Sequence, residues 1–231
     1  ADFANAVTQR HNSVNETSLQ ECYSCSNSGS DSVSCSEAVN PYQCSGYVLP
    51  TEAEWEYACR AGSRAGYPSA IKDLGKYGNF ADRTLYDDRE LVHYIYACQE
   101  ADDGYGRVFA PVGQYLPNPW GIHDMLGNLA ELCSTYYLDK LTPGIDPNFQ
   151  SLPDPRGSRH RVSRGGSWCS PPEYLHVAFR NAFTGTQTPH IGMRLVLRQG
   201  EGLTRTRNEI SNALQAKLDA EKKAREKERK E

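Results

Sequence analysis

Apolar and polar residues alternate most clearly in the last third of the chain. The alternation runs from Arg161 to the glycine pair Gly165-Gly166, and further apolar runs follow at 177–179 and 191–197. Turn-forming residues separate these runs, so the pattern predicts three short strands joined by loops. Two adjacent glycines at the end of a strand-like run indicate a bulge or a close approach of backbones. Because loops between strands often carry binding groups, this stretch is the first candidate for a functional surface.

A helical pattern covers residues 50–61. Thr51 is a suitable N-cap, and Glu54 three residues later completes a capping box. The acidic residues of the first turn suit the helix dipole, which is a structural role rather than a catalytic one. We expect Trp55 and Tyr57 to pack inside the domain and Cys59 to be buried.

The composition of the chain changes after Gln199. Two glycines mark a break, and the charged sequence beyond them is typical of a helix. Its larger apolar residues recur at intervals of four, at Ile210, Leu214 and Leu218. The pattern therefore predicts one domain over 1–199 and a charged helical extension over 200–231. We expect residues 203–218 to dock on a partner helix or on the domain.

Composition and charge narrow the class of protein. Of the 231 residues, 38% are hydrophobic, and the 19 glycines and 13 prolines are typical of a loop-rich globular domain. A net charge of −4 does not indicate a protein that binds nucleic acid. No apolar run is long enough to span a membrane.

Four of the eight cysteines lie in one serine- and glycine-rich loop: Cys22, Cys25, Cys35 and Cys44. Their spacing admits either a structural zinc site with four thiolate ligands or two disulfides. A loop with few hydrophobic residues needs such a cross-link, and an exported protein would use disulfides. We favour disulfides and, with them, a periplasmic, cell-surface or extracellular location, and the zinc site is the alternative.

Three blocks of sequence stand out beyond the general pattern. They are LPTEAEWEYA at 49–58, NPWGIHDMLGN at 118–128, and the group RGGSW, VAFR and IGMR at 164–168, 177–180 and 191–194. In this order the blocks resemble the formylglycine-generating enzyme (sulfatase-modifying factor) family. The resemblance implies an α+β fold, a loop-rich variant of the C-type lectin fold. Residues 2–7 look like an early helix of the family that normally follows a further N-terminal segment, which we expect to have been cleaved or to lie on another chain.

The resemblance also implies two calcium sites, built from the carboxylate, amide and carbonyl oxygens that calcium prefers. The positions that match the first site are the side chains of Asn79 and Asp103 and the carbonyl groups of Phe80 and Tyr105. Asn128 and Glu131 match the second site. The tryptophans that flank this second site in the family are replaced by Ala130 and Leu132.

In active members of the family, two cysteines after the glycine pair bind copper(I), an ion that selects soft thiolates. Here Cys169 is the one cysteine of that segment, and His176 could supply an imidazole in place of the second thiolate. Cys169 and His176 are therefore the catalytic candidates, but the missing thiol predicts that copper oxidation is lost. Arg180 and Arg194 match buried arginines of the family, and we expect them to pair with carboxylates, including those of the helix at 50–58.

The loops around the predicted strands offer a candidate ligand-binding face, with the side chains of Trp168, Tyr174, Phe183 and His190. Rigid aromatic rings among small polar residues suit recognition of a protein or a ligand. The segment also resembles the variable proteins of diversity-generating retroelements. The sequence therefore predicts a binding or scaffold module with a protein partner. The alternatives are an active oxidase that converts a substrate cysteine to formylglycine, and a variable binding protein.

Overall fold

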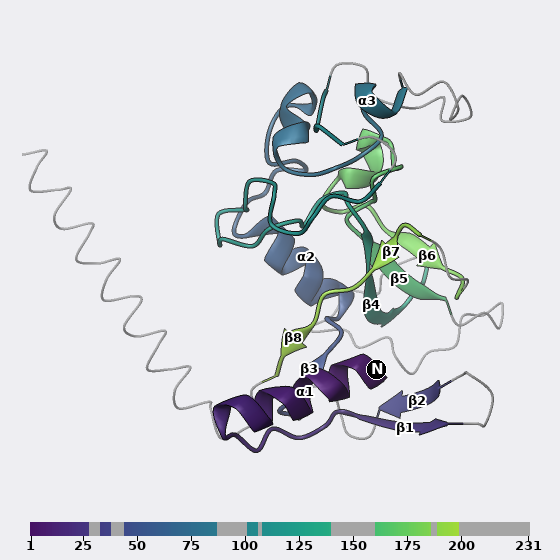
Figure 1. Ribbon diagram of the computed structural model, residues 1–231. Helices are drawn as coiled ribbons and strands as arrows, with labels where there is room; N and C mark the ends of the chain where they lie inside the picture. Colours follow the sequence, from purple (N-terminus) through teal and green to yellow (C-terminus); the bar gives the residue numbers. More distant parts are fainter. Residues whose placement is uncertain are drawn as a thin grey trace, which may run out of the picture. The chain divides into compact units, whose positions relative to one another are not determined.

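The computed structural model describes residues 1–27, 33–37, 44–86, 101–105, 108–139, 160–185 and 189–198 (Figure 1). The chain divides into two compact units. Unit 1 combines Ala1–Val48 with the chain from Val196 onward, and unit 2 contains Leu49–Leu195. The helix expected at 203–218 and the domain boundary expected near Gly200 lie outside the described residues. Within the described ranges, no helix has the length and apolar character needed to cross a membrane.

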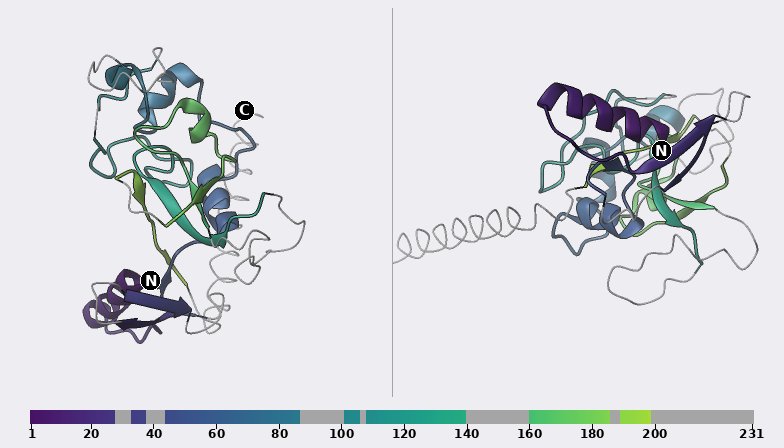
Figure 2. Two further views of the ribbon diagram at one scale, coloured as in Figure 1. Left: turned by 90° about the vertical axis from the view of Figure 1, so that its right-hand side faces the viewer. Right: turned by 90° about the horizontal axis from the view of Figure 1, so that it is seen from below.

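The described part of unit 1 consists of a helix, a hairpin and a short pair of strands. The elements are α1 (Asp2–Asn15), β1 (Tyr23–Asn27), β2 (Val33–Glu37), β3 (Tyr47–Val48) and β8 (Val196–Leu197). β1 pairs with β2 and β3 pairs with β8, both antiparallel, and α1 contacts β1 and β3 (Figure 2). Two polar side chains of α1 make these contacts specific. Asn5 exchanges hydrogen bonds with the backbone of Tyr23, and Thr8 Oγ1 accepts one from the N–H of Tyr47.

Two disulfides cross-link unit 1. Cys22 pairs with Cys44 and Cys25 pairs with Cys35, with Cα–Cα separations of 5.7 and 4.1 Å. Cys25 and Cys35 are directly opposite in the register of β1 and β2. Cys22 and Cys44 form the small core of the unit together with Val48. The preference for disulfides is confirmed, and the pairing leaves none of these four thiolates for a zinc ion.

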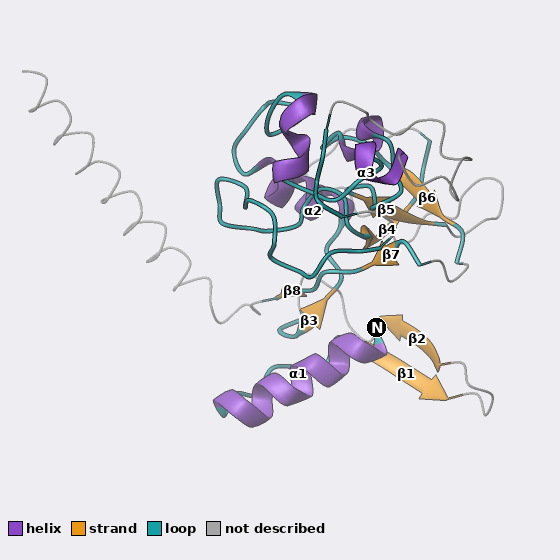
Figure 3. Ribbon diagram, turned by 45° about the horizontal axis from the view of Figure 1, so that its top comes forward, coloured by secondary structure: helices purple, strands orange, loops and turns teal. Residues whose placement is uncertain are grey.

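Unit 2 packs α2 against a four-stranded sheet, and loops make up much of the remainder (Figure 3). Its elements are α2 (Glu52–Arg60), the 3-10 helix η1 (Ile71–Lys76), α3 (Arg83–Tyr86), β4 (Ala130–Tyr136), β5 (Arg161–Arg164), the 3-10 helix η3 (Pro172–Leu175), β6 (Asn181–Phe183) and β7 (Ile191–Gly192). The strand order is β6-β5-β4-β7, in which β4 and β7 are parallel and the other pairs are antiparallel. This mixture of helices, a small sheet and long loops confirms the predicted α+β class.

The three strands predicted between residues 161 and 197 are confirmed in part. The first run forms β5. The second run does not form a strand. Val177 is buried, but its N–H donates to the carbonyl oxygen of Gly66 in a loop, at 2.9 Å, and not to a neighbouring strand. β6 begins instead at Asn181. The third run divides into β7 and β8, which belong to different units.

The capping box predicted at the start of α2 is present. Thr51 Oγ1 accepts a hydrogen bond from the N–H of Glu54 at 3.3 Å, and the Glu54 carboxylate accepts one from the N–H of Thr51 at 2.8 Å. Trp55 and Cys59 are buried, as expected. The expectation that Tyr57 packs inside was wrong, since its side chain is 69% exposed. Two residues along an α-helix bring a side chain to nearly the opposite face, so Trp55 and Tyr57 cannot both face the core.

The glycine pair ends β5 with positive φ angles of 90° at Gly165 and 71° at Gly166. A Cβ atom at Gly165 would lie 3.0 Å from the carbonyl oxygen of Met125, and one at Gly166 would lie 2.9 Å from Leu175 Cδ1. The pair therefore permits both a left-handed turn and a close approach, as its sequence predicted. It directs the chain from the core strand β5 into the segment that begins at Ser167, where the candidate site lies.

Candidate functional site

A cavity of about 200 Å³ lies beside the segment that follows β5, and we call it the Cys169 cavity. Its polar lining consists of hydroxyl, thiol, amide and imidazole groups, from Ser163, Ser167, Cys169, Ser170, Asn181 and His190. Tyr174 and Phe179 form an aromatic wall, and their rings stack with centroids 4.2 Å apart. No Asp, Glu, Lys or Arg occurs among the described residues that line it. The lining therefore suits an uncharged polar ligand.

Ser163 gives this cavity an unused hydrogen-bonding group. The residue lies on β5 and is 1% exposed, and its Oγ has no hydrogen-bond partner among the described residues. A buried polar group without a partner costs about 1–3 kcal/mol, so a ligand atom that bonds this hydroxyl would recover part of that cost. Ser163 was not among the site residues predicted from the sequence. The sequence did offer one signal, a serine inside a predicted strand, between Val162 and Arg164. Val162 is buried in the core, and Ser163 is buried as well.

Cys169 supplies the thiol of the cavity. Its Sγ lies 3.4 Å from the Oγ of Ser167, which in turn lies 3.0 Å from the Oγ of Ser170. The other described cysteines outside the disulfides, Cys59 and Cys133, are buried in the core. Burial raises the pKa of Cys59 to about 12 and also raises the pKa of Cys133, so neither offers a thiolate at neutral pH. In the described part of the chain, no three His, Cys, Asp or Glu side chains are grouped so as to hold a metal ion.

His176 does not line the Cys169 cavity. Its Nδ1 accepts a hydrogen bond from the N–H of Ala178 at 3.1 Å, and its ring packs edge-on against Tyr67. The structure thus gives the two catalytic candidates separate surroundings. Among the described contacts, none joins Cys169 to His176.

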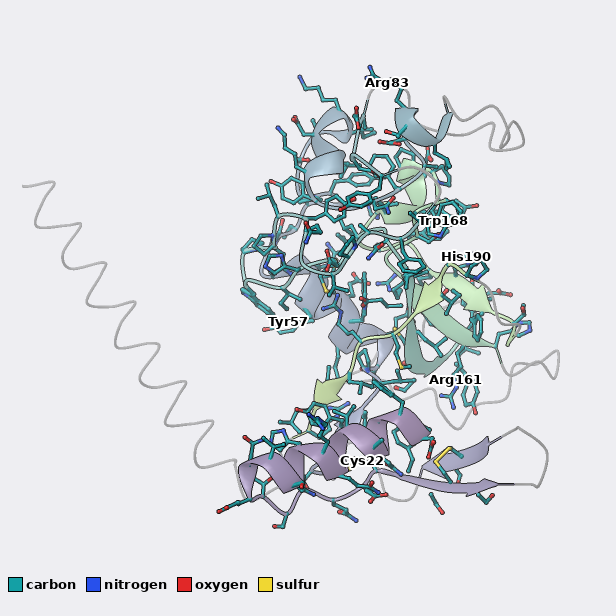
Figure 4. All side chains as sticks on the ribbon, in the orientation of Figure 1. Cys22, Tyr57, Arg83, Arg161, Trp168 and His190 are labelled. Carbon is teal, nitrogen blue, oxygen red and sulfur yellow. A yellow bond between two sulfur atoms is a disulfide. The ribbon has the colours of Figure 1, made fainter. Side chains whose placement is uncertain are left out.

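The predicted binding face is brought together in part. Tyr174 and His190 line the Cys169 cavity, whereas Trp168 and Phe183 do not. Trp168 belongs to the loop after the glycine pair, where its backbone N–H donates to the carbonyl oxygen of Asn128 (Figure 4). Phe183 ends β6, opposite Arg161 of β5. Two of the four predicted residues therefore line one cavity, and the binding face as a whole stays a prediction.

Buried arginine–glutamate pairs tie α2 to the strands that carry the cavity. Arg180 contacts Glu52 through two nitrogen atoms, as its sequence match predicted. Arg164, which the sequence analysis did not single out, has a fully buried side chain that contacts both Glu52 and Glu56. Its guanidinium also lies over the ring of Trp55. Because a buried charge needs a partner, these pairs fix α2 and β5 relative to each other.

The residues predicted for the first calcium site lie together. The Asp103 carboxylate accepts hydrogen bonds from the N–H groups of Phe80 and Tyr105, at 2.7 and 2.8 Å. Asn79 is fully buried, and its Oδ1 has no hydrogen-bond partner among the described residues. Burial, with a contribution from neighbouring aspartates, raises the pKa of Asp103 to about 7. No Arg or Lys pairs with Asp103 in the described residues, so the site has oxygen atoms that a calcium ion would satisfy.

The residues predicted for the second calcium site are already engaged. Asn128 Oδ1 accepts a hydrogen bond from the N–H of Ala110 at 2.8 Å. Glu131 accepts one from the indole N–H of Trp55 at 2.6 Å and two from Arg194, each at 2.7 Å. Arg194 therefore pairs with a carboxylate, as expected, but with that of β4 rather than of α2. Since its guanidinium neutralises Glu131, the geometry does not call for a cation, and this calcium site stays a prediction.

The sequence and the fold agree with one family of proteins. A family model described as "Sulfatase-modifying factor enzyme 1-like domain" matches residues 3–199. The chain belongs to this family, as the three sequence blocks indicated.

The similar proteins include formylglycine-generating enzymes and a variable protein of known structure. The chain is 33% identical over 173 residues to the formylglycine-generating enzyme of Mycobacterium tuberculosis, covering 69% of this chain and 54% of that protein. It is 35% identical over 162 residues to the enzyme of Streptomyces coelicolor, covering 68% and 47%. Among solved structures, variable protein 1 of Treponema denticola is similar with a TM-score of 0.58 and 26% identity, over 85% of this chain and 66% of that one. The chain thus spans about half the length of the curated relatives it matches.

Proposed function

We propose that this chain is a binding module of the formylglycine-generating-enzyme type, in which the Cys169 cavity receives an uncharged polar group of a ligand or protein partner. The observation that carries the proposal is the lining of the cavity, which combines a buried, unpaired hydroxyl with a single thiol. A ligand that bonds Ser163 would satisfy a hydroxyl that has no partner among the described residues. Tyr174, stacked on Phe179 and 42% exposed, offers an aromatic surface at the same place.

The same lining argues against copper oxidation. Copper(I) prefers soft thiolate ligands, and the described lining holds one sulfur atom, that of Cys169. The hydroxyl oxygen of Ser167 lies 3.4 Å from this sulfur, and it is a hard ligand that copper(I) does not select. Formylglycine formation, the activity named for the two actinobacterial relatives, is the alternative function.

We further propose that the protein is exported. Two disulfides in a small unit with a core of few apolar residues support this proposal, because disulfides persist in oxidising compartments.

We also propose that one calcium ion binds at Asn79 and Asp103, with the carbonyl groups of Phe80 and Tyr105. The support is the fully buried Asn79 Oδ1, which has no hydrogen-bond partner among the described residues. The next residue, Phe80, donates its N–H to the buried Asp103 carboxylate. When bound, calcium would supply positive charge and connect the turn at 79–80 to the turn at 103–105. Its role would be structural, since none of these residues lines the Cys169 cavity.

Replacing Ser167 by cysteine provides a direct test of the missing thiol. Ser167 Oγ lies 3.4 Å from Cys169 Sγ, so S167C would place two sulfur atoms side by side. We expect S167C to bind copper(I) more tightly than the wild type by about tenfold or more, the effect of about 1.4 kcal/mol of binding free energy. Competition with a chromogenic copper(I) chelator measures the difference.

The control is the double variant S167C/C169S, which again has one sulfur and should return to the wild-type affinity. Equal copper(I) affinity of wild type and S167C would contradict the proposal, because another residue would then already complete the site.

A further inference from the structure

A second cavity in unit 2, of about 310 Å³, lies at the C-terminal end of α2, and we call it the Arg60 cavity. Its walls are mainly apolar and aromatic, with Tyr67, Tyr77, Leu116, Ile122, Met125 and Val177 among them. None of its lining residues is shared with the Cys169 cavity. Its volume and its apolar walls are those of a small-molecule site.

Asn118, a polar residue of this cavity, is occupied by the protein itself. Its side-chain amide donates to the carbonyl oxygens of Ala58 and Cys59, at the end of α2. Its Oδ1 accepts hydrogen bonds from the N–H groups of Trp120 and Ile122. The side chain therefore closes the end of the helix and shapes the cavity wall, and it is not free to bind a ligand.

Arg60, unlike Asn118, can still interact with a ligand, because the negative charge near its guanidinium only partly balances the positive charge. In the described residues, the network around α2 joins the carboxylates of Glu52 and Glu56 to three guanidinium groups. One oxygen of Glu56 contacts Arg60 at 2.7 Å, and the other contacts the fully buried Arg164. The remaining carboxylate, Glu52, is held by Arg164 and Arg180. Arg60 thus shares a single carboxylate with a buried arginine that depends on it.

The guanidinium of Arg60 still has donors available. It uses three nitrogen atoms in contacts with Glu56 and with the carbonyl oxygen of Ala65. The group carries further N–H bonds, and its planar shape matches a carboxylate. Its side chain is 28% exposed, so a ligand can reach it.

We propose that the Arg60 cavity binds a small amphipathic carboxylate, whose apolar body fills the cavity and whose anionic head pairs with Arg60. The apolar walls favour burial of a hydrocarbon chain or ring, because each buried methylene contributes about 0.8 kcal/mol. The guanidinium, whose charge Glu56 matches only in part, favours an anion over a neutral molecule or a cation.

Decanoate serves as the probe, in calorimetric titration of the full chain below the concentration at which it forms micelles. We expect wild type to bind decanoate with a dissociation constant below about 1 mM. R60Q should weaken binding about tenfold or more, because it removes the charge and keeps a polar side chain. The matched control is R64Q, which removes an exposed arginine that does not line the cavity and should change affinity less than about twofold.

Two further measurements separate the apolar and the charged parts of the proposal. The neutral analogue 1-decanol should bind wild type more weakly than decanoate and should bind R60Q as it binds wild type. L116D, at a lining residue that is 52% exposed, should abolish decanoate binding while the melting temperature stays near that of wild type. The proposal is overturned if decanoate does not bind, if R60Q and R64Q weaken it equally, or if 1-decanol binds wild type as tightly.

Discussion

Replacing Arg164 by leucine is expected to lower the free energy of unfolding by about 3–5 kcal/mol, the cost of breaking a buried ion pair from one side. The side chain of Arg164 is fully buried on β5, between Glu52 and Glu56 of α2. It also donates to the carbonyl oxygen of Phe179, next to the Cys169 cavity. Leucine would remove the hydrogen bond to the Phe179 carbonyl oxygen. It would also remove one positively charged partner from both Glu52 and Glu56.

Thermal unfolding measures this loss, which corresponds to a fall in melting temperature of roughly 6–20 °C for a chain of this size. R60Q is the matched control, because it removes another partner of Glu56 at a partly exposed position. An exposed i,i+4 pair contributes only about 0.3–0.5 kcal/mol, so the control should melt near wild type. Similar melting temperatures for R164L and R60Q would contradict the central role assigned to Arg164.

Removing calcium is expected to produce the second large effect. A ligand that binds only the folded state stabilises it by about 2.7 kcal/mol at a concentration one hundred times its dissociation constant. A chelator should therefore lower the melting temperature, and D103N should remove the response to calcium. E131Q is the informative control, because Glu131 is held by Arg194 and Trp55 and should not be needed for the response. Loss of the response in E131Q but not in D103N would contradict this proposal, because calcium would then bind at Asn128 and Glu131 instead.

The Asp103 carboxylate also predicts how the stability of the folded protein depends on pH. Burial raises the pKa of Asp103 from 3.8 to about 7 in the folded protein. As the pH rises from about 4 to about 7, the unfolded chain releases this proton first, so the folded state loses stability in chelator. Bound calcium favours the ionised form and should remove or reverse that slope. Melting curves at about pH 5 and pH 7.5, with chelator and with calcium, test the sign, and D103N should flatten the difference.

Local sequence rules were sufficient where a feature depends on neighbouring residues. The capping box of Thr51 and Glu54 is set within one turn of helix, and the turn at Gly165-Gly166 needs the φ angles that glycine permits. The clustered cysteines could be assigned to disulfides because an apolar core is sparse around them. Their pairing could not be read from spacing, because it is fixed by the register of β1 and β2.

Features that depend on contacts between residues far apart in the chain could not be predicted from the sequence. Ser163 became a candidate only when its strand was seen to place an unpaired hydroxyl at a cavity. His176 and Cys169 are close in sequence, yet the 3-10 helix at Pro172–Leu175 separates them, and the ring of His176 packs on Tyr67. The Arg60 cavity is assembled from segments near residues 60, 77, 120 and 177, which are far apart in the sequence, so no local pattern predicts that they enclose a cavity.

The most direct test of the binding-module account is turnover. Wild type loaded with copper(I) is incubated with oxygen and a cysteine-containing sulfatase peptide, while an oxygen electrode follows consumption and mass spectrometry follows the peptide. The formylglycine-generating enzyme of Mycobacterium tuberculosis, a relative of this chain, serves as the positive control. We predict no oxygen consumption above the peptide-free rate and an unchanged cysteine. Oxygen consumption with conversion of that cysteine to formylglycine would contradict the account.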